Sequence, residues 1–398
     1  MEKSVDSLPL LIPEAHQRFA IEEITAVAQV RRAAMNLAMW GNFSEEDAGK
    51  VGIVVSELAT NIVKHAGRGE ILLRMRHGAN ASSCVEIVAL DTGAGIANLA
   101  DSMRDGMSTA GTAGNGLGAM QRLAAEFDVY SRVGQGSAFY LCLWSGTAPA
   151  VATPSLQFGA VSLPKSGEES CGDAWYCDVR GDTALIAMAD GLGHGPDAAT
   201  AARAVLSVCA EEDITAPARL LDLAHQRARS TRGAAAAFAT SKLHSLDLKG
   251  HGFKGHGIEG HGIEGHELKD RELTDFELNN FELNKQAGTL RYAGIGNITG
   301  SICDEHSKRH LISHHGIVGH TPRKAREMTA EWDANAAIVL HSDGISSQWN
   351  LAAYPGLLQC HAALIAAVLY RDFVRKTDDA TILVIKRLAP ISSAATHD

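Results

Sequence analysis

A helical stripe near residue 60 carries two side chains that could act on a nucleotide. The segment SELATNIVKHA (56–66) spaces Glu57 and Asn61 four residues apart, which places both on one face of a helix. On such a stripe a carboxylate can activate a hydroxyl group, and a neighbouring carboxamide can hold a phosphate-bound Mg²⁺. His65, in the same segment, is interpreted as a structural helix residue.

Two glycine-rich motifs could complete this nucleotide site. In DTGAGI (91–96), Asp91 stands at a strand end, and Gly93 and Gly95 let the backbone turn and approach a ligand closely. In GNGLGAM (114–120), a glycine-rich turn opens a helix whose free N–H groups suit phosphate oxygens. The three motifs fall in this order on a helix, a strand end and a helix start, and together they predict a nucleotide-binding site.

A second set of acidic residues stands at strand ends or glycine turns in the later half of the chain. In ADGLGHG and HSDGIS an apolar strand runs directly into Asp-Gly, which presents the carboxylate at the end of the strand. Oxygen ligands without cysteine favour Mg²⁺ or Mn²⁺ over zinc. Two such ions lower the pKa of a shared water and clamp a phosphoryl group for in-line attack. The candidate metal ligands are Asp173, Asp190, Asp343 and Asp378, with Asp379 as a supporting residue.

The elements that position the first site follow from the hydrophobic pattern. Ser44 is a plausible N-cap with acidic residues in the turn that follows, which indicates the start of a helix. Alternation and glycine turns indicate strands elsewhere. Helices are expected over 22–39, about 45–66 and 117–127, strands over 71–77 and 83–91, and a hairpin over 128–144.

The segment TAPAVATP (147–154) is small, contains proline and lacks periodicity, which is typical of a linker. We therefore expect one domain over 15–146, a linker over 147–157 and a second domain over 158–390. The second domain contains many strand candidates and two or three helices, which indicates a layered α+β architecture. Its strands are expected over 158–164, 172–190, 234–243, 288–303, 336–343 and 380–388, with an Ala-rich helix over 196–211.

A repeat of period five interrupts the second domain over residues 246–285. Five is neither a helical nor a strand period, so the repeat implies neither element directly. We interpret it as a tandem expansion that forms a long flexible loop between two hairpin strands. A pentapeptide-repeat coil, or metal binding by the repeat's histidines, remain alternatives.

Composition limits the class of protein. The chain has 398 residues, of which 45% are hydrophobic and 21% charged, and this fits two or three globular domains. The net charge of −10 and the short basic stretches give little support to nucleic-acid binding. Seven scattered cysteines without a CxxC motif predict reduced thiols rather than a disulfide or zinc framework. The absence of a long apolar run or a signal-like segment predicts a cytoplasmic protein without a membrane partner.

Residues 20–144 resemble the GHKL ATPase superfamily (the Bergerat fold), and within it the anti-sigma-factor serine/threonine kinases of the RsbT type. The resemblance implies an α/β sandwich that binds ATP, with Asn61 as a Mg²⁺ ligand and Glu57 as the catalytic base toward a substrate hydroxyl. It also implies that Asp91 hydrogen-bonds the adenine amino group beneath a lid over about 98–115. The residues that would shape the pocket are Gly93, Gly95, Gly116, Leu117 and Gly118.

Residues 158–390 resemble the type 2C metal-dependent protein phosphatases of the SpoIIE-like branch, in their short RsbX-type form. The resemblance implies an α-β-β-α sandwich in which Asp190 bridges two metal ions as the central catalytic residue, and Gly191 offers its carbonyl. It implies that Asp343 and Asp378 hold the first metal, assisted by Asp173. RYAGIGNI (291–298) resembles that family's central strand and loop. His194 could donate a proton to the leaving serine, but we interpret it as a turn residue.

The function hypothesis is a bifunctional partner-switching enzyme that uses ATP and Mg²⁺ or Mn²⁺. One half would phosphorylate a serine or threonine of a STAS-domain partner, either an anti-sigma antagonist or a stressosome scaffold protein, and the other half would remove such a phosphate. One alternative is a phosphatase regulated by a non-catalytic ATP-sensing domain. The other is a non-enzymatic module that binds an antagonist or a sigma-factor regulatory protein without turnover.

Overall fold

The computed structural model describes residues 12–78, 82–103, 116–146, 148, 156–210, 216–243, 288–320 and 325–388. Most of the expected linker (147–157), most of the expected lid and the whole period-five insert therefore lie outside the described residues. The last two residues of that linker, Leu156 and Gln157, instead begin the first strand of the second half. Among the described helices, none is both long and apolar enough to cross a membrane.

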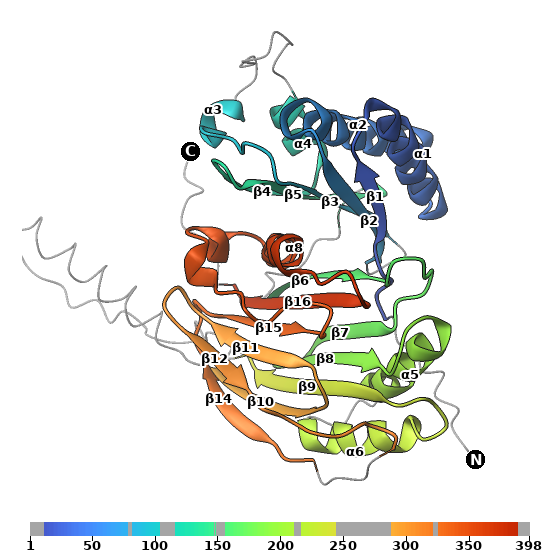
Figure 1. The fold of residues 1–398 in the computed structure, drawn as a ribbon, viewed down its shortest axis with the longest axis vertical. Coiled ribbons are helices and arrows are strands. Elements are labelled where there is room, and N and C mark those ends of the chain that lie inside the picture. The colour runs from blue at the N-terminus through green and yellow to red at the C-terminus, as the bar shows by residue number, and fades with distance from the viewer. Residues whose placement is uncertain are drawn as a thin grey trace, which may run out of the picture.

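The first half is an antiparallel sheet with helices on one face. Its strand order is β1-β2-β3-β5-β4, and α1, α2 and α4 lie above the sheet in Figure 1. Apolar residues of α1 and α2 pack on the sheet and form one continuous hydrophobic cluster with it. The strands are β1 (Gln17–Ile21), β2 (Gly69–His77), β3 (Ser83–Asp91), β4 (Glu126–Arg132) and β5 (Gly136–Trp144). The helices are α1 (Ile24–Trp40), α2 (Glu45–Asn61), α3 (Leu99–Ser102) and α4 (Gly116–Leu123).

The structure bears out one helix boundary expected in this half and corrects another. The helix expected to run to residue 66 changes at Ile62 into a single π-helical turn, which Gly67 ends with a φ of +76°. The helix expected over 117–127 ends at Leu123, because the N–H of Ala125 already donates to the carbonyl of Cys142 in the neighbouring strand. The segment from Glu126 to Arg132 instead forms β4, which pairs with β5.

The second half contains two stacked sheets, which are antiparallel except for the short parallel pairing of β13 with β10. One has the order β12-β11-β15-β16-β6, and the other has the order β13-β10-β9-β8-β7 with β14 paired to β10. Apolar residues from the two sheets interlock in one cluster, and α5 and α6 cover the outer face of the second sheet. The strands are β6 (Leu156–Leu163), β7 (Asp173–Arg180), β8 (Thr183–Gly191), β9 (Ala234–Lys242), β10 (Gly288–Ile295), β11 (Thr299–Cys303), β12 (Lys308–Leu311), β13 (Ser313–His314), β14 (Met328–Trp332), β15 (Ala337–His341) and β16 (Ala380–Arg387). The helices are α5 (Pro196–Leu206), α6 (Pro217–Arg227) and α8 (Ala362–Phe373).

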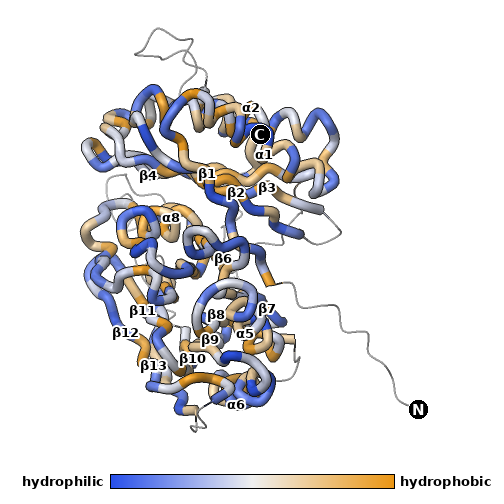
Figure 2. The backbone as a smooth tube through the Cα atoms, turned by 45° about the vertical axis from the view of Figure 1, so that its right-hand side comes forward, coloured by the Kyte–Doolittle hydropathy of each residue, from blue (hydrophilic) through white to orange (hydrophobic). Residues whose placement is uncertain are grey.

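Helix α8 separates the two halves. It covers the remaining outer face of the second half, which completes the expected α-β-β-α sandwich, and its other side faces the sheet of the first half (Figures 1 and 2). Every residue from Ala362 to Tyr370 is buried. One hydrophobic cluster contains Leu72 and Val88 of the first sheet together with Leu364 of α8 and Val384 of β16. The two halves therefore share a core.

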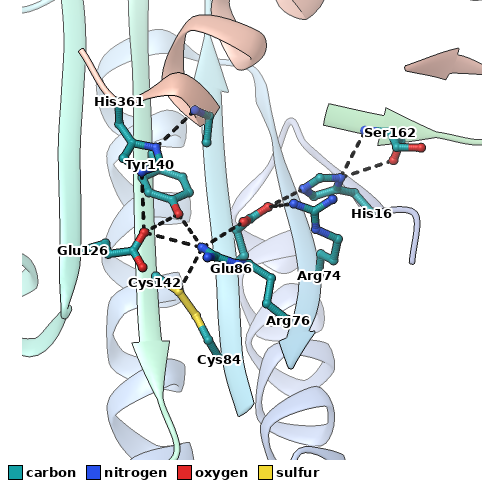
Figure 3. Close-up of polar contacts among 11 residues, drawn as sticks. His16, Arg74, Arg76, Cys84, Glu86, Glu126, Tyr140, Cys142, Ser162 and His361 are labelled. Carbon is teal, nitrogen blue, oxygen red and sulfur yellow. Dashed lines mark hydrogen bonds and ion pairs between the residues drawn. A yellow bond between two sulfur atoms is a disulfide. The ribbon is translucent and has the colours of Figure 1, made fainter. Parts of the chain in front are cut away.

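A buried polar network crosses the same interface (Figure 3). Glu86 accepts a hydrogen bond from Arg74 at 2.6 Å, and His16 Nε2 lies 3.0 Å from the same carboxylate oxygen. His16 reaches the second half through its backbone N–H, which donates to the carbonyl of Ser162 at 2.7 Å. Burial opposes ionisation of Glu86, but Arg74 and His16 outweigh it and lower the pKa of this carboxyl.

A second branch of the network ends at the start of α8. The Tyr140 hydroxyl donates to Glu126 at 2.7 Å and accepts from Arg76 at 2.8 Å. The imidazole of His361 stacks on the Tyr140 ring with centroids 4.3 Å apart, and its Nε2 lies 3.6 Å from Glu126. Burial lowers the pKa of His361 to about 4, so this ring is neutral at pH 7.

The structure joins Cys84 and Cys142 in a disulfide, which corrects the prediction that all cysteines are reduced. The two residues are 58 apart in sequence, but the antiparallel register of β3 and β5 places them diagonally, with Cα atoms 6.1 Å apart. This distance is within the range that a disulfide spans. Sequence spacing could not reveal the pair, because the proximity arises only from the strand register.

Candidate nucleotide pocket and acidic cavity

Helix α2 presents the first pair of candidate residues. The Ser44 side chain caps its first turn by accepting from the N–H of Asp47 at 3.1 Å. The apolar stripe of the helix, which includes Val51 and Leu58, is buried. Glu57 is consequently exposed, and Asn61, one turn later, is half-buried at the end of α2. Both side chains therefore share the stripe that does not enter the core, as their spacing predicts.

Asp91 ends β3 and is held by the turn that follows it. Its Oδ1 accepts from the N–H of Gly93 at 2.8 Å and from the N–H of Ser137 at 3.2 Å. Burial raises the pKa of the Asp91 carboxyl, and the two backbone donors partly oppose that shift. Gly95 has a φ of +72° and packs directly on the backbone of Arg132, so the turn tolerates no side chain there.

Helix α4 begins beside α2. A Cβ atom at Gly116 would lie only 3.2 Å from the Glu57 carboxylate, so the first turn of α4 faces that side chain. Leu117 is half-buried and Gly118 is buried. A Cβ atom at Gly93 would lie 2.6 Å from Ala66, which follows α2. The structure thus brings the three motifs together around the ends of α2, β3 and α4, while residues 104–115 of the expected lid lie outside the described ranges.

The acidic residues of the second half surround a cavity of about 460 Å³. Asp190 at the end of β8, Asp343 after β15 and Asp378 before β16 all line it. The same wall includes Asn297, whose side-chain N–H donates to Asp343 at 2.7 Å. The remaining lining residues are Leu192, Gly193, Ala235, Gly296, His315, Gly316 and Ile317.

The carboxylates of this cavity repel one another. Burial, followed by the charges of Asp343 and Asp378, raises the pKa of Asp190 to about 7. Asp173 lies opposite Asp190 in the β7–β8 register, and burial and the charge of Asp190 raise its pKa well above the usual range. The Ser342 hydroxyl donates to one oxygen of Asp173 at 2.7 Å, whereas the other oxygen has no hydrogen-bond partner within the described ranges.

This donor set suits divalent cations that prefer oxygen ligands. Asp190 and Asp173, whose pKa values are raised, are carboxyls that a bound cation would stabilise in their charged form. In the part of the chain that the structure describes, no three His, Cys, Asp or Glu side chains are already gathered at coordinating distance. The residues that could hold a metal are therefore assigned from the cavity that they share and from its chemistry.

The other candidates of the acidic set lie close by. Gly191 ends β8 and packs against the backbone of Ala198 in α5. Asp379 accepts from the N–H of Lys165 at 2.9 Å, which fits a supporting residue. His194 lies in the turn after β8, and its Nδ1 is 2.7 Å from Oε1 of Glu168.

Sequence reasoning did not identify Asn297, His315 or Leu192 as lining residues. Asn297 occurs in the motif RYAGIGNI, which pointed to the correct loop without indicating the side chain. Leu192 lies in the motif ADGLGHG, two residues after Asp190, so that motif also marked the correct loop without indicating the side chain. His315 lies in a segment that carries no sequence signal for this cavity.

The first half has two features of a histidine kinase-like ATPase domain. One is the antiparallel sheet with helices on one face, and the other is the set of three motifs at the ends of α2, β3 and α4. The model of the family "Histidine kinase-like ATPase domain" matches residues 22–142. Over 118 residues the chain is 32% identical to the serine/threonine-protein kinase RsbT of Bacillus subtilis (strain 168), which covers 30% of this chain and 88% of RsbT. The chain belongs, through this segment, to the family of RsbT.

Two solved structures are among those that the chain matches. The structure of RsbX in complex with magnesium is 18% identical, with a TM-score of 0.39, and the match covers 58% of this chain and 96% of that one. The phosphatase domain of SpoIIE from Bacillus subtilis, solved with a fragment of its regulatory domain, is 11% identical with a TM-score of 0.39. That match covers 92% of this chain and 93% of the other.

Proposed function

We propose that this chain is a bifunctional partner-switching enzyme, with a protein-serine/threonine kinase in its first half and a metal-dependent phosphoserine/phosphothreonine phosphatase in its second half. The observation that carries the proposal is the presence of both arrangements in one chain. One is an RsbT-related nucleotide pocket with Glu57 beside the start of α4, and the other is a cavity lined by three carboxylates. A protein substrate is proposed because RsbT is itself a serine/threonine-protein kinase. The partners proposed are STAS-domain proteins of the anti-sigma antagonist or stressosome type.

In the kinase half, ATP would bind with its adenine at Asp91 and its phosphates at the glycine-rich start of α4, over residues 116–118. A substrate hydroxyl oxygen attacks the γ-phosphorus, the bond to the β–γ bridging oxygen breaks, and ADP leaves. Glu57 is exposed to an incoming partner and would accept the hydroxyl proton. Asn61 would ligate Mg²⁺, which neutralises phosphate charge when it is bound.

In the phosphatase half, Asp190, Asp343 and Asp378 would hold Mg²⁺ or Mn²⁺, with the Gly191 carbonyl and Asp173 in support. The bound cations would supply an activated water and neutralise the phosphate. The chain's own contribution is to orient Asp343 through Asn297 and to form the walls of the cavity from Leu192, His315 and other neighbours.

Two variants test the activities separately. Asp190→Ala should abolish phosphate release from a purified phospho-STAS partner, and the exposed Asp182→Ala on the same hairpin should not. Asn61→Ala should abolish labelling of the partner from γ-labelled ATP, and the exposed Asn36→Ala on α1 should not. Normal hydrolysis by the Asp190 variant would refute the metal assignment.

The same assays separate the two rival functions. A chain that binds ATP and hydrolyses the phosphopartner, but never transfers phosphate in a single-turnover assay, would be a phosphatase with an ATP-sensing half. Binding of the partner with neither transfer nor release would indicate a non-enzymatic switch.

A further inference from the structure

Arg371 is the residue of α8 that reaches the nucleotide pocket of the other half. Its Nη1 donates to the backbone carbonyl of Asp91 at 3.1 Å and lies 3.5 Å from the carbonyl of Ser137. The side chain is only 7% exposed, although α8 belongs to the second half of the chain.

The two carbonyls that Arg371 contacts frame the Asp91 side chain. The N–H of Ser137 donates to Asp91 Oδ1, so the ends of β3 and β5 already hold the carboxylate between them. One guanidinium nitrogen therefore contacts both strand ends through their carbonyls, while the N–H of Gly93 in the turn holds the carboxylate. Gly136, with a φ of +79°, packs directly on the Asp91 carbonyl and leaves no side chain between the two strand ends.

The orientation of Arg371 is itself fixed. Asp372 accepts from its Nε at 2.7 Å and from its Nη2 at 3.1 Å. The Tyr354 hydroxyl in turn donates to Asp372 at 2.8 Å. A guanidinium held on one edge by a carboxylate has its remaining nitrogen directed at a defined point.

We propose that Arg371, which the phosphatase half supplies, is a positioning residue for the nucleotide pocket. Its guanidinium holds Asp91 in the position from which this residue recognises the adenine base. The inference rests on the proposed role of Asp91 in nucleotide binding. It adds that the kinase half does not possess a complete base-recognition site without α8.

The test is calorimetric titration of the full-length chain with ADP and with GDP in the presence of Mg²⁺. Arg371→Ala should weaken ADP binding by about three- to tenfold, which corresponds to the net contribution of one ordinary hydrogen bond. GDP binding should change less, so the preference for adenine should fall. Arg371→Lys, which keeps a charged donor, should recover part of both.

Arg132→Ala is the matched control. The Arg132 guanidinium also crosses between the halves, where it donates to the carbonyl of Ala353 at 2.7 Å, but it does not contact Asp91 through its side chain. Its ADP affinity and adenine preference should equal those of the wild-type chain. Equal losses in both variants, or no loss in either, would overturn the proposal.

Two further outcomes are distinguishable. If Arg371→Ala does not fold, Asp372→Asn removes the carboxylate that orients the guanidinium, and it should lower the adenine preference in the same direction. An unchanged preference in that variant would overturn the inference. If the wild-type chain itself binds no adenine nucleotide, the proposed kinase function fails first, and this inference fails with it.

Discussion

Replacing Glu86 with glutamine should destabilise the whole chain. Glu86 is buried, accepts from Arg74 at 2.6 Å, and has His16 and Arg76 at 3.0 and 3.5 Å. The substitution removes the only formal charge directly paired with Arg74 within the described ranges, and that guanidinium is 2% exposed, with Nε and Nη1 already lacking partners there. Breaking a buried ion pair by removing one partner costs about 3–5 kcal/mol, and we expect a loss of that size.

The measurement is urea denaturation of the full-length chain, followed by intrinsic fluorescence and by circular dichroism. Glu46→Gln is the control, because the Glu46 side chain is 82% exposed in its pair with Lys50 and should cost about 0.5 kcal/mol or less. The double variant Arg74→Met with Glu86→Leu should recover most of the loss, since an apolar pair leaves no buried charge.

A loss below about 1 kcal/mol in Glu86→Gln would refute the reasoning, because it would mean that Arg74 is solvated or paired elsewhere. Failure of the double variant to recover stability would also count against it.

Three further perturbations follow from the interface, the core and the insert. Because burial lowers the pKa of His361 to about 4, the unfolded chain binds a proton between pH 6.5 and about 4 that the folded chain does not. Stability should therefore be lost as pH falls through that window. The free energy of unfolding, measured by urea denaturation, should fall between pH 7 and pH 5 by on the order of 1–2 kcal/mol more in the wild type than in His361→Gln; equal losses would contradict this. A Cβ atom at Gly159 of β6 would collide with the backbone of Ala363, so Gly159→Ala should cost about 1–3 kcal/mol. Gly49→Ala, at an open position on α2, should instead stabilise by about 0.5–1 kcal/mol, and the opposite order of denaturation midpoints would refute the packing argument. Deletion of residues 246–285 should leave the melting curve and phosphate release unchanged, and loss of either would contradict the interpretation of this segment as a flexible loop.

The elements nearest the two sites were predictable because their signals are local. Ser44 and the acids after it mark the start of α2, and the apolar strands that run into Asp190 and Asp343 place both carboxylates at strand ends. Predictions from such local patterns agree with the folded structure because the residues that carry the pattern are the same residues that form the element.

The interface could not be predicted. Helix α8 is apolar on all sides because it is buried between two sheets, so it lacks the amphipathic period by which surface helices are recognised. Arg74 and Glu86 occupy strand positions whose polarity indicates an exposed face, yet they are buried because the second half covers that face. The contact of Arg371 with Asp91 joins residues 280 apart, and sequence alone contains no signal for it.

The core that the two halves share through α8 limits where the chain can be truncated. Truncation near residue 150 follows the boundary expected from the sequence. It would expose the side chains of Leu72 and Val88 on one fragment and the apolar residues of α8 on the other. Each fragment would then expose a large apolar surface to water, and such surfaces promote aggregation. Truncation studies should therefore retain α8 with the nucleotide-binding piece, or replace its apolar contact residues, before loss of activity is attributed to missing chemistry.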